Sequence, residues 1–259
     1  MELLVAGCAV LGLLTGSFAN VVIHRVPAGE SVVSPPSACP HCGAAVRPRD
    51  NVPVLSWLLL RGRCRDCGAP IAWRYPLVEL AMALAFAVAA RRIGWSWLLP
   101  GMLLFTWTLL VLAVIDAETR RIPNRLTYPL TPALVVLLGV GALLEGDAAA
   151  ALRVVLGGAA AGGALLALAL ATPRGMGMGD VKLAAFIGAG LGALGWAEVV
   201  VGVFGGFLIG GVAGIGLLAT KLRRRSDHIP FGPYLAAGAF VSLLAGGELA
   251  GAYLRSWGL

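Results

Sequence analysis

Two aspartates stand at the edges of long apolar runs. Asp116 ends the run Leu109–Ile115, and Asp180 follows the glycine-rich segment Gly175–Gly179 and precedes a second apolar run. Placing a carboxylate in or beside a membrane span costs free energy, so a carboxylate found there is expected to have a function. Two carboxylates that share a site cannot both ionise, so they hold one proton between them. Such a pair can hydrolyse a peptide bond: the ionised member takes a proton from the attacking water, and the protonated member donates a hydrogen bond to the carbonyl oxygen.

Other interpretations of these carboxylates stay open at this point. Asp180 could cap the helix that follows it, a favoured position for Asp. Asp116 could pair with Arg120 or Arg121. Carboxylates in membrane spans also relay protons in transporters, where they lie near the bilayer midplane in broken helices.

Two groups of glycines stand out among the 36 in the chain. Gly175, Gly177 and Gly179 approach Asp180, and backbone without side chains there suits a loop against which an extended substrate can lie. We therefore predict that these three form a substrate-binding loop. Other glycines occur in adjacent pairs within apolar runs, where they let helices approach closely. These pairs are at 157–158, 162–163, 205–206 and 210–211.

Four cysteines form two C-x-x-C pairs, Cys39 with Cys42 and Cys64 with Cys67, and 21 residues separate the pairs. Two such knuckles supply four thiolates to a tetrahedral zinc ion. The usual spacer is about 15–20 residues, so this one is slightly long. Gly43 and Gly68 follow the second cysteine of each pair, where a knuckle needs a permissive backbone. The pattern predicts a structural zinc site.

Alternatives to zinc are a pair of disulfides or a redox site. A cytoplasmic location disfavours stable disulfides, and a thioredoxin-like site needs a C-x-x-C that opens a helix. His41 would allow a Cys₃His variant. Cys8 lies in the first apolar run and is interpreted as a small apolar residue in a helix interface.

The composition is that of a membrane protein. Of 259 residues, 59% are hydrophobic and 13% are charged, and the mean hydropathy is +0.87. A soluble domain carries about 25% charged residues. The net charge of +7 does not indicate nucleic-acid binding, because the basic residues lie in short loops between apolar runs rather than on one face. We expect contact with membrane lipid and none with nucleic acid.

About 17 to 25 apolar residues span a bilayer, and the sequence predicts eight such helices. Met1–Val22 is interpreted as part of the first span rather than as a cleaved signal peptide, because no basic residue precedes it. The fold class is therefore an all-α polytopic membrane protein with three parts: a first transmembrane helix (1–23), a cytoplasmic four-cysteine zinc domain (24–75) and a membrane protease domain (76–259). The predicted spans are 3–23, 76–91, 95–115, 127–144, 150–172, 181–196, 197–220 and 232–254.

The basic residues predict the orientation. Sixteen of the 20 Lys and Arg residues lie in four loops, at 24–75, 116–126, 173–182 and 221–231. The excess of Lys and Arg in cytoplasmic loops then places these four loops in the cytoplasm. Asp116 and Asp180 would both lie at the cytoplasmic mouth of the helix bundle.

Several segments resemble the type IV prepilin peptidases. Gly175–Leu183 is similar to the GxGD signature of that family, which presenilin-type proteases share more loosely. Ile115–Thr127 resembles the family's first catalytic segment, an Asp followed by a short loop that ends in Ile-Pro-Asn. Gly16–Arg25, Arg74–Glu79 and Ile229–Pro233 match further family segments in family order.

The resemblance implies that Asp116 and Asp180 are catalytic, on the cytoplasmic side of a bacterial inner membrane. It implies prepilins and pseudopilins as substrates, cut after a leader-terminal glycine, for type IV pili or type II secretion. It also implies N-methylation of the new N-terminal residue with S-adenosylmethionine, since family members with the cysteine-bearing domain generally have both activities.

The site of the methyl donor cannot be assigned from spacing, because the sequence has no glycine-rich nucleotide loop of the Rossmann type. Arg74, Tyr75 and Glu79 are candidates near the junction of the cysteine domain and the membrane. Anchoring of a helix end among lipid headgroups is the alternative role for them. A non-catalytic scaffold and a serine protease of the rhomboid type fit less well, the latter because all three His lie outside the predicted spans.

Overall fold

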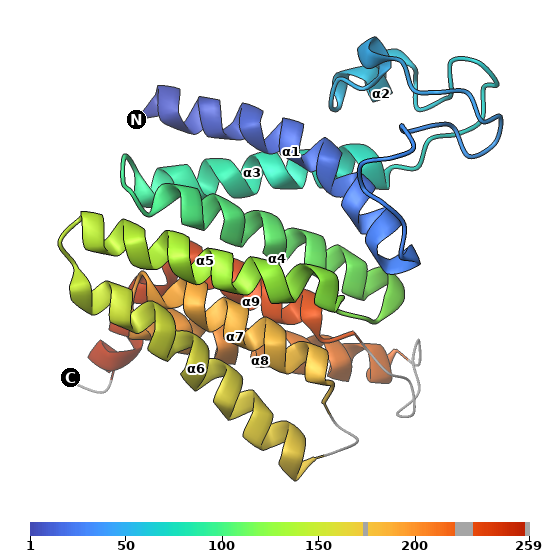
Figure 1. Cartoon of the computed structure of the whole chain (residues 1–259). Helices are drawn as coiled ribbons and strands as arrows, with labels where there is room; N and C mark the ends of the chain where they lie inside the picture. The colour runs from blue at the N-terminus through green and yellow to red at the C-terminus, as the bar shows by residue number, and fades with distance from the viewer. Residues whose placement is uncertain (173–175, 221–229, 257–259) are drawn as a thin grey trace. The chain divides into compact units, whose positions relative to one another are not determined.

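The computed structural model describes residues 1–172, 176–220 and 230–256, which are mostly helical (Figure 1). The cysteine-bearing segment 29–73, between α1 and α3, is mostly irregular. Within these residues there is no β-strand, only two isolated bridges, Ala38 with Ala45 and Arg63 with Pro70. The predicted all-α class is confirmed. The elements are α1 (Glu2–Ala28), η1 (Pro48–Asp50), α2 (Leu55–Leu59), α3 (Arg74–Ile93), α4 (Leu99–Thr119), α5 (Asn124–Leu144), α6 (Ala148–Ala171), α7 (Met178–Gly192), α8 (Trp196–Ala219) and α9 (Gly232–Ser256).

Every predicted span corresponds to a helix, but a count of eight membrane crossings is not confirmed. Among the described residues, six helices are long and apolar enough to cross a bilayer: α1, α4, α5, α6, α8 and α9. α3 has charged residues near both ends, Arg74 and Glu79 at one and Arg91 and Arg92 at the other. α7 has 15 residues and is about 22 Å long, whereas the hydrocarbon core is about 30 Å thick.

Several helix boundaries differ from the predicted spans, among them those of α1 and α4. α1 continues to Ala28, so His24 and Arg25, predicted in a loop, belong to its last turns. α4 begins at Leu99 rather than at residue 95 and ends at Thr119. Residues 97 and 98 form a turn instead, and the Glu145 carboxylate beside it accepts hydrogen bonds from the Ser96 hydroxyl and the Trp97 amide. Asp116 therefore lies inside the last turn of α4 rather than beyond it.

The chain divides into two compact units, an N-terminal unit (Met1–Gly94) and a C-terminal unit (Trp95–Leu259). In the N-terminal unit, α1 and α3 pack along each other in opposite directions. A Cβ added to Gly12 would lie 2.7 Å from the Cα of Ala83, and one added to Gly16 would lie 2.9 Å from the Cα of Glu79. Small residues four positions apart allow this close approach of two membrane helices.

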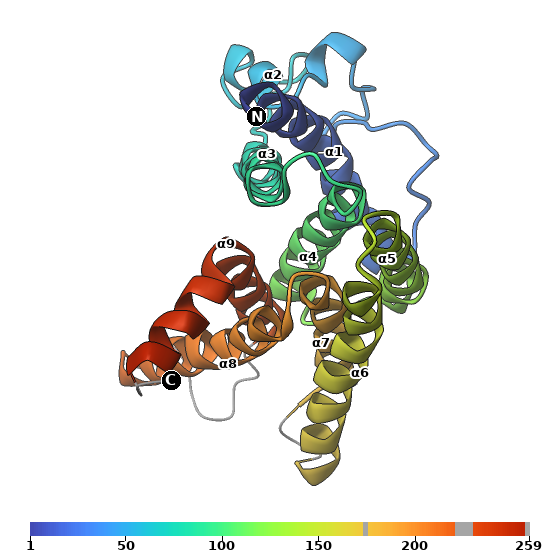
Figure 2. The ribbon, with the colours of Figure 1, turned by 90° about the vertical axis from the view of Figure 1, so that its left-hand side faces the viewer.

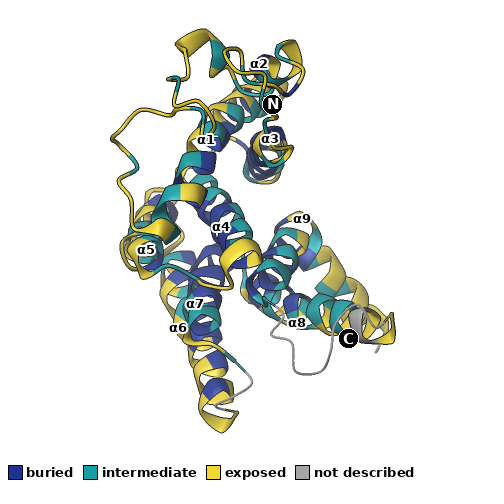
Figure 3. Cartoon of the chain, turned by 90° about the vertical axis from the view of Figure 1, so that its right-hand side faces the viewer, coloured by how far each residue is buried: buried dark blue, intermediate teal, exposed yellow. Residues whose placement is uncertain are grey.

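In the C-terminal unit, α4 packs against α5, α7 and α9, while α6 lies beside α7 and α8 beside α9 (Figure 2). Buried residues are concentrated on α4 and α7, and much of α6 is exposed (Figure 3). Gly157 of α6 meets Gly188 of α7 backbone to backbone: a Cβ on Gly157 would lie 2.5 Å from the Gly188 carbonyl oxygen. At Gly157 the paired glycines thus have the predicted packing role, whereas Gly163 and Gly211 meet no atom within 4 Å. The unit thus brings together the C-terminal end of α4 and the N-terminal ends of α7 and α9.

Candidate functional site

Asp116 lies in the last turn of α4, and its side chain is 5% exposed. Its Oδ2 accepts a hydrogen bond from the backbone N–H of Gly232, with a donor–acceptor distance of 2.9 Å. Gly232 is the first residue of α9, so the carboxylate sits at the positive end of that helix. Within the described residues, neither Arg120 nor Arg121 forms an ion pair with Asp116.

Asp180 lies in the first turn of α7 and is partly buried. Its carboxylate is close enough to that of Asp116 for the two negative charges to repel each other. The residue at the N-cap of α7 is Gly177, and Asp180 is three positions later, so Asp180 is not the capping residue. The fold brings the two predicted aspartates into one neighbourhood.

The predicted glycine loop is only partly a loop. Gly175 lies outside the described residues, as does Arg174. Gly177 has an extended backbone with φ −83°, which any residue adopts, and a Cβ there would meet Asp180 Oδ2 at an ordinary 3.6 Å. Gly179 already belongs to α7, because the helix begins at Met178.

Gly179 faces the segment that follows α4. A Cβ on Gly179 would lie 3.2 Å from the Cβ of Ile122, so the absence of a side chain lets this segment approach α7. A second link lies nearby: the Lys182 ammonium donates a hydrogen bond to the Asn124 amide oxygen at 2.7 Å and stands over the Tyr128 ring, 4.7 Å from its centroid. The two aspartate-bearing segments are therefore joined at two points.

The four cysteines form the predicted cluster. All four Sγ atoms lie within 4.8 Å of one another, and those of Cys39 and Cys67 are 3.8 Å apart. Four sulfurs at about 2.3 Å from one zinc ion are about 3.8 Å apart at the corners of a tetrahedron. The cysteines are free thiols in this structure, and the exposed His41 is not part of the cluster. The thiols present fit a tetrahedral metal ion.

The two knuckles have the same backbone geometry. In each, the glycine after the second cysteine donates its N–H to the first cysteine's carbonyl at 2.9 Å. Both glycines, Gly43 and Gly68, have φ +72°, a conformation that favours glycine. The permissive backbone predicted at these two positions is confirmed.

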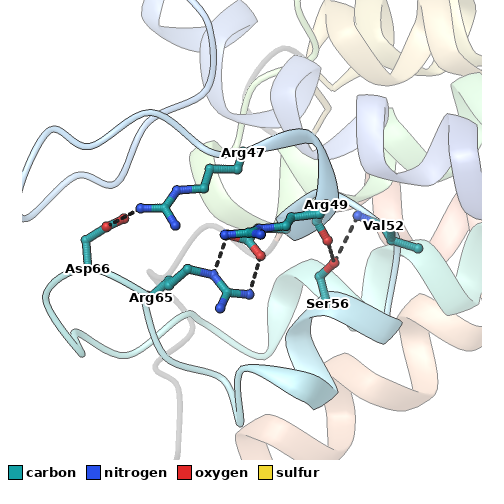
Figure 4. A network of polar contacts seen from close by, with 7 residues as sticks. Arg47, Arg49, Val52, Ser56, Arg65 and Asp66 are labelled. Carbon is teal, nitrogen blue, oxygen red and sulfur yellow. Dashed lines mark hydrogen bonds and ion pairs between the residues drawn. The ribbon is translucent and has the colours of Figure 1, made fainter.

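Two ion pairs join the second knuckle to the segment that follows the first (Figure 4). The Arg47 guanidinium, beyond the first knuckle, contacts Asp66 inside the second at 2.7 Å. Arg65, also inside the second, contacts both carboxylate oxygens of Asp50 at 2.6 and 2.8 Å. The hydrogen bond from Arg65 keeps the pKa of Asp50 below its usual value. Sequence spacing alone does not indicate these pairs.

The thiols of the cluster differ in acidity. The backbone N–H groups of Cys42 and His41 lower the pKa of Cys39 to about 6. The Ala69 N–H lowers the pKa of Cys67, but desolvation and hydrogen bonds with the three neighbouring cysteines together raise it to about 12.

The methyl-donor candidates begin α3 and are already engaged in contacts. The Arg74 guanidinium stands over the Tyr75 ring, 5.1 Å from its centroid, and the Tyr75 carbonyl accepts a hydrogen bond from the Asn20 amide. Glu79 is buried, and its carboxylate accepts the Val54 N–H at 2.7 Å. Glu79 thus ties the cysteine-bearing segment to α3.

A cavity of about 240 Å³ lies nearby, between α1 and the cysteine-bearing segment. It is smaller than the roughly 300–1,000 Å³ of usual ligand sites. By its volume, this cavity is therefore not a cradle for a ligand of the size of S-adenosylmethionine. The residues that line it are Leu14, Ser17, Phe18, Val21, Ser37, Asn51 and Pro53.

Comparison with known proteins gives consistent matches along the chain. Residues 10–93 match the bacterial peptidase A24 N-terminal domain, and residues 103–215 match the type IV leader peptidase family. The prepilin leader peptidase/N-methyltransferase of Aeromonas hydrophila is 39% identical over 95% of this chain and 92% of the relative. The protein of the same name from Stutzerimonas stutzeri is 38% identical over 96% of this chain and 93% of the relative. That from Neisseria gonorrhoeae is 37% identical over 92% of this chain and 89% of the relative. No solved structure matches the chain.

Proposed function

Because the chain belongs to the type IV leader peptidase family, we propose that it cleaves prepilin and pseudopilin leaders with Asp116 and Asp180 as the catalytic pair. It is a multi-pass inner-membrane enzyme that removes prepilin leaders and methylates the new N-terminus. The pair is supported by one observation above the others: two carboxylates, 64 positions apart in sequence, lie within electrostatic range at adjoining helix ends.

The proposed reaction follows from two neighbouring carboxylates that hold one proton. The ionised carboxylate takes a proton from a water molecule, whose oxygen attacks the scissile carbonyl carbon. The protonated carboxyl donates a hydrogen bond to the carbonyl oxygen and stabilises the charge that develops there. The C–N bond then breaks, and the carboxyl group that took the proton from water passes it to the leaving amine. The Gly232 N–H holds the Asp116 carboxylate in place during these steps.

Gly175, Gly177 and Gly179 are proposed to receive the substrate beside Asp180. A peptide bond within a helix is shielded by its own hydrogen bonds, so the leader junction must become extended before it is cut. The exposed, extended Gly177 offers backbone groups with which an added strand could bond. Gly179 contributes differently, by admitting Ile122 against α7.

The active site is proposed to face the cytoplasm, because Arg120 and Arg121 lie in the loop between α4 and α5 and Arg125 lies in the first turn of α5. A second of the four basic loops used for the orientation, with Lys221 and Arg223–Arg225, lies outside the described residues. Proton-coupled transport gains no support, because both carboxylates lie in terminal turns of their helices.

Zinc is the proposed ion of the cysteine cluster, with a structural role. Four thiolates close the coordination shell and leave no open position for substrate. Cys39, Cys42, Cys64 and Cys67 would hold it, and the ion would fix the fold of residues 24–75. Arg74 and Tyr75 remain proposed contacts for the methyl donor. Glu79 would act indirectly, through the backbone of Val54.

The direct test incubates the detergent-solubilised enzyme with a prepilin and S-adenosylmethionine. Mass spectrometry should show loss of the leader and a gain of one methyl group on the new N-terminal residue. Recovery of the intact prepilin from an enzyme that is folded by circular dichroism would contradict the proposal.

A further inference from the structure

The short helix α2 exposes three leucines in a segment outside the predicted membrane spans. Leu55, Leu58 and Leu59 are all exposed, and Leu59 is 82% exposed. Clustered apolar side chains on a surface mark a site that contacts a protein or a membrane. We call Leu55, Leu58, Leu59 and the neighbouring Trp73 the α2 surface.

Polar contacts on the opposite side of α2 fix this orientation. Ser56 is buried, and its hydroxyl donates to the Arg49 carbonyl and accepts from the Val52 N–H, both at 3.0 Å (Figure 4). Turning the leucines inward would break both hydrogen bonds and leave buried polar groups unpaired. The exposure of the leucines is therefore built into the fold of this segment.

The α2 surface is tied to the start of α3. The Trp57 indole N–H donates to the Ile71 carbonyl at 3.1 Å, and the Trp57 and Trp73 rings are 4.2 Å apart. The bond from the Val54 N–H to buried Glu79 reaches one turn further along α3. These contacts hold α2 at a defined place beside the first turns of α3.

An apolar face of α3 begins at the same place. Trp73, Leu77, Leu80 and Leu84 are exposed and recur at the spacing of one helix face. α3 packs along α1, which is long and apolar enough to cross a bilayer, so lipid is a fitting partner for this exposed face. Trp73 belongs to both surfaces, so the α2 surface is continuous with the exposed apolar face of α3.

Charge favours an anionic membrane surface as the partner. Arg61 and Arg63 follow α2 and are exposed, and among the described residues neither forms an ion pair. Arg47 and Arg65, in contrast, pair with Asp66 and Asp50. Basic residues beside a bilayer attract anionic headgroups, and Trp is enriched at the membrane interface.

We propose that the α2 surface is an interfacial anchor, in which Leu55, Leu58 and Leu59 insert among lipid acyl chains while Arg61 and Arg63 contact anionic headgroups. The anchor holds the cysteine cluster against the leaflet. One consequence rests on the proposed function: the apolar helix of a cleaved pilin keeps its new N-terminus at that leaflet, so the anchor places the cysteine-bearing segment where methylation must occur.

The test uses the full-length enzyme in nanodiscs of phosphatidylglycerol and phosphatidylcholine that contain a phospholipid with a diazirine in its acyl chain. After illumination, mass spectrometry should find lipid adducts on the peptide that contains residues 55–59. The adducts should decrease severalfold in discs of phosphatidylcholine alone, and also in the Arg61→Gln/Arg63→Gln variant.

A Leu58→Glu/Leu59→Glu variant should lose the α2 adducts, whereas adducts on the peptide that contains Leu77 and Leu80 persist. Val33→Glu is the matched control, because Val33 is 86% exposed on the same segment but lies outside the α2 surface. Its α2 adducts should equal those of the unmodified protein.

The unmodified protein alone can overturn the proposal. Lipid adducts on α3 without any on α2 would show that this surface does not touch the bilayer. Chemical cross-links from α2 to another protein segment, in place of lipid adducts, would assign the surface to that segment. Neither result bears on leader cleavage, which is measured separately.

Discussion

Replacing Gly232 with alanine should slow leader cleavage without unfolding the protein. A Cβ added at Gly232 would lie 2.7 Å from Oδ2 of Asp116 and 3.1 Å from its Cβ and Cγ. Non-bonded heavy atoms rest at about 3.5 Å, so the carboxylate has to retreat by roughly 0.8 Å. A misplacement of about 1 Å costs on the order of 100-fold in rate. We therefore expect kcat to fall by about 30- to 100-fold while KM changes little.

The variant should stay folded, because its net loss of stability is about 0–2.5 kcal/mol, below the roughly 5–15 kcal/mol that holds a typical protein folded. Alanine favours a helix over glycine by about 0.5–1 kcal/mol, and the local crowding costs about 1–3 kcal/mol. The assay compares single-turnover cleavage of a prepilin with the thermal unfolding midpoint of the same sample.

Gly163→Ala is the matched control for Gly232→Ala. A Cβ at Gly163, within α6, meets no atom within 4 Å. This control should cleave at the normal rate. A Gly232→Ala enzyme with an unchanged kcat would refute the placement of Asp116 against the start of α9.

Two further predictions concern the glycine approach and the metal. Gly179→Val should lose most cleavage activity, because its branched side chain pushes against Ile122, which lies 3.2 Å from the new Cβ. Gly177→Ala should lose less activity, because its Cβ meets Asp180 only at 3.6 Å. Equal cleavage rates of the two variants, in samples of equal thermal stability, would contradict this. Elemental analysis should find about one zinc per chain. Cys64→Ser should lower the zinc content and impair methylation more than cleavage, and a metal-free preparation with both activities intact would refute a structural zinc.

The candidate sites were predictable where the signal is local. A cysteine knuckle is defined within five residues, so the positive φ of Gly43 and Gly68 and the four-sulfur cluster follow from the C-x-x-C-G pattern. Asp116 and Asp180 were predictable as a candidate pair because each stands where an apolar run meets polar residues. The all-α membrane fold follows from the apolar runs themselves.

Contacts between distant segments were not predictable in this way. Gly232 and Asp116 are separated by 116 positions, and no spacing rule connects them. The same holds for Lys182 with Asn124 and for Glu79 with Val54. Helix ends were also misplaced, as at the start of α4, beside which Glu145 contacts Ser96. The apolar runs likewise do not distinguish α7, which is enclosed by neighbouring helices, from a full-length span.

The aspartate pair is tested most directly by Asp116→Asn and Asp180→Asn, each purified and assayed for prepilin cleavage by mass spectrometry. Asparagine keeps the shape of the side chain but cannot accept or hold the shared proton. Losing one member of a catalytic unit should reduce kcat by a factor on the order of 10⁴ or more. Glu118→Gln, two residues along and exposed, should cleave at nearly the normal rate. Cleavage at the normal rate by either folded asparagine variant would contradict the assignment of Asp116 and Asp180 as the catalytic pair.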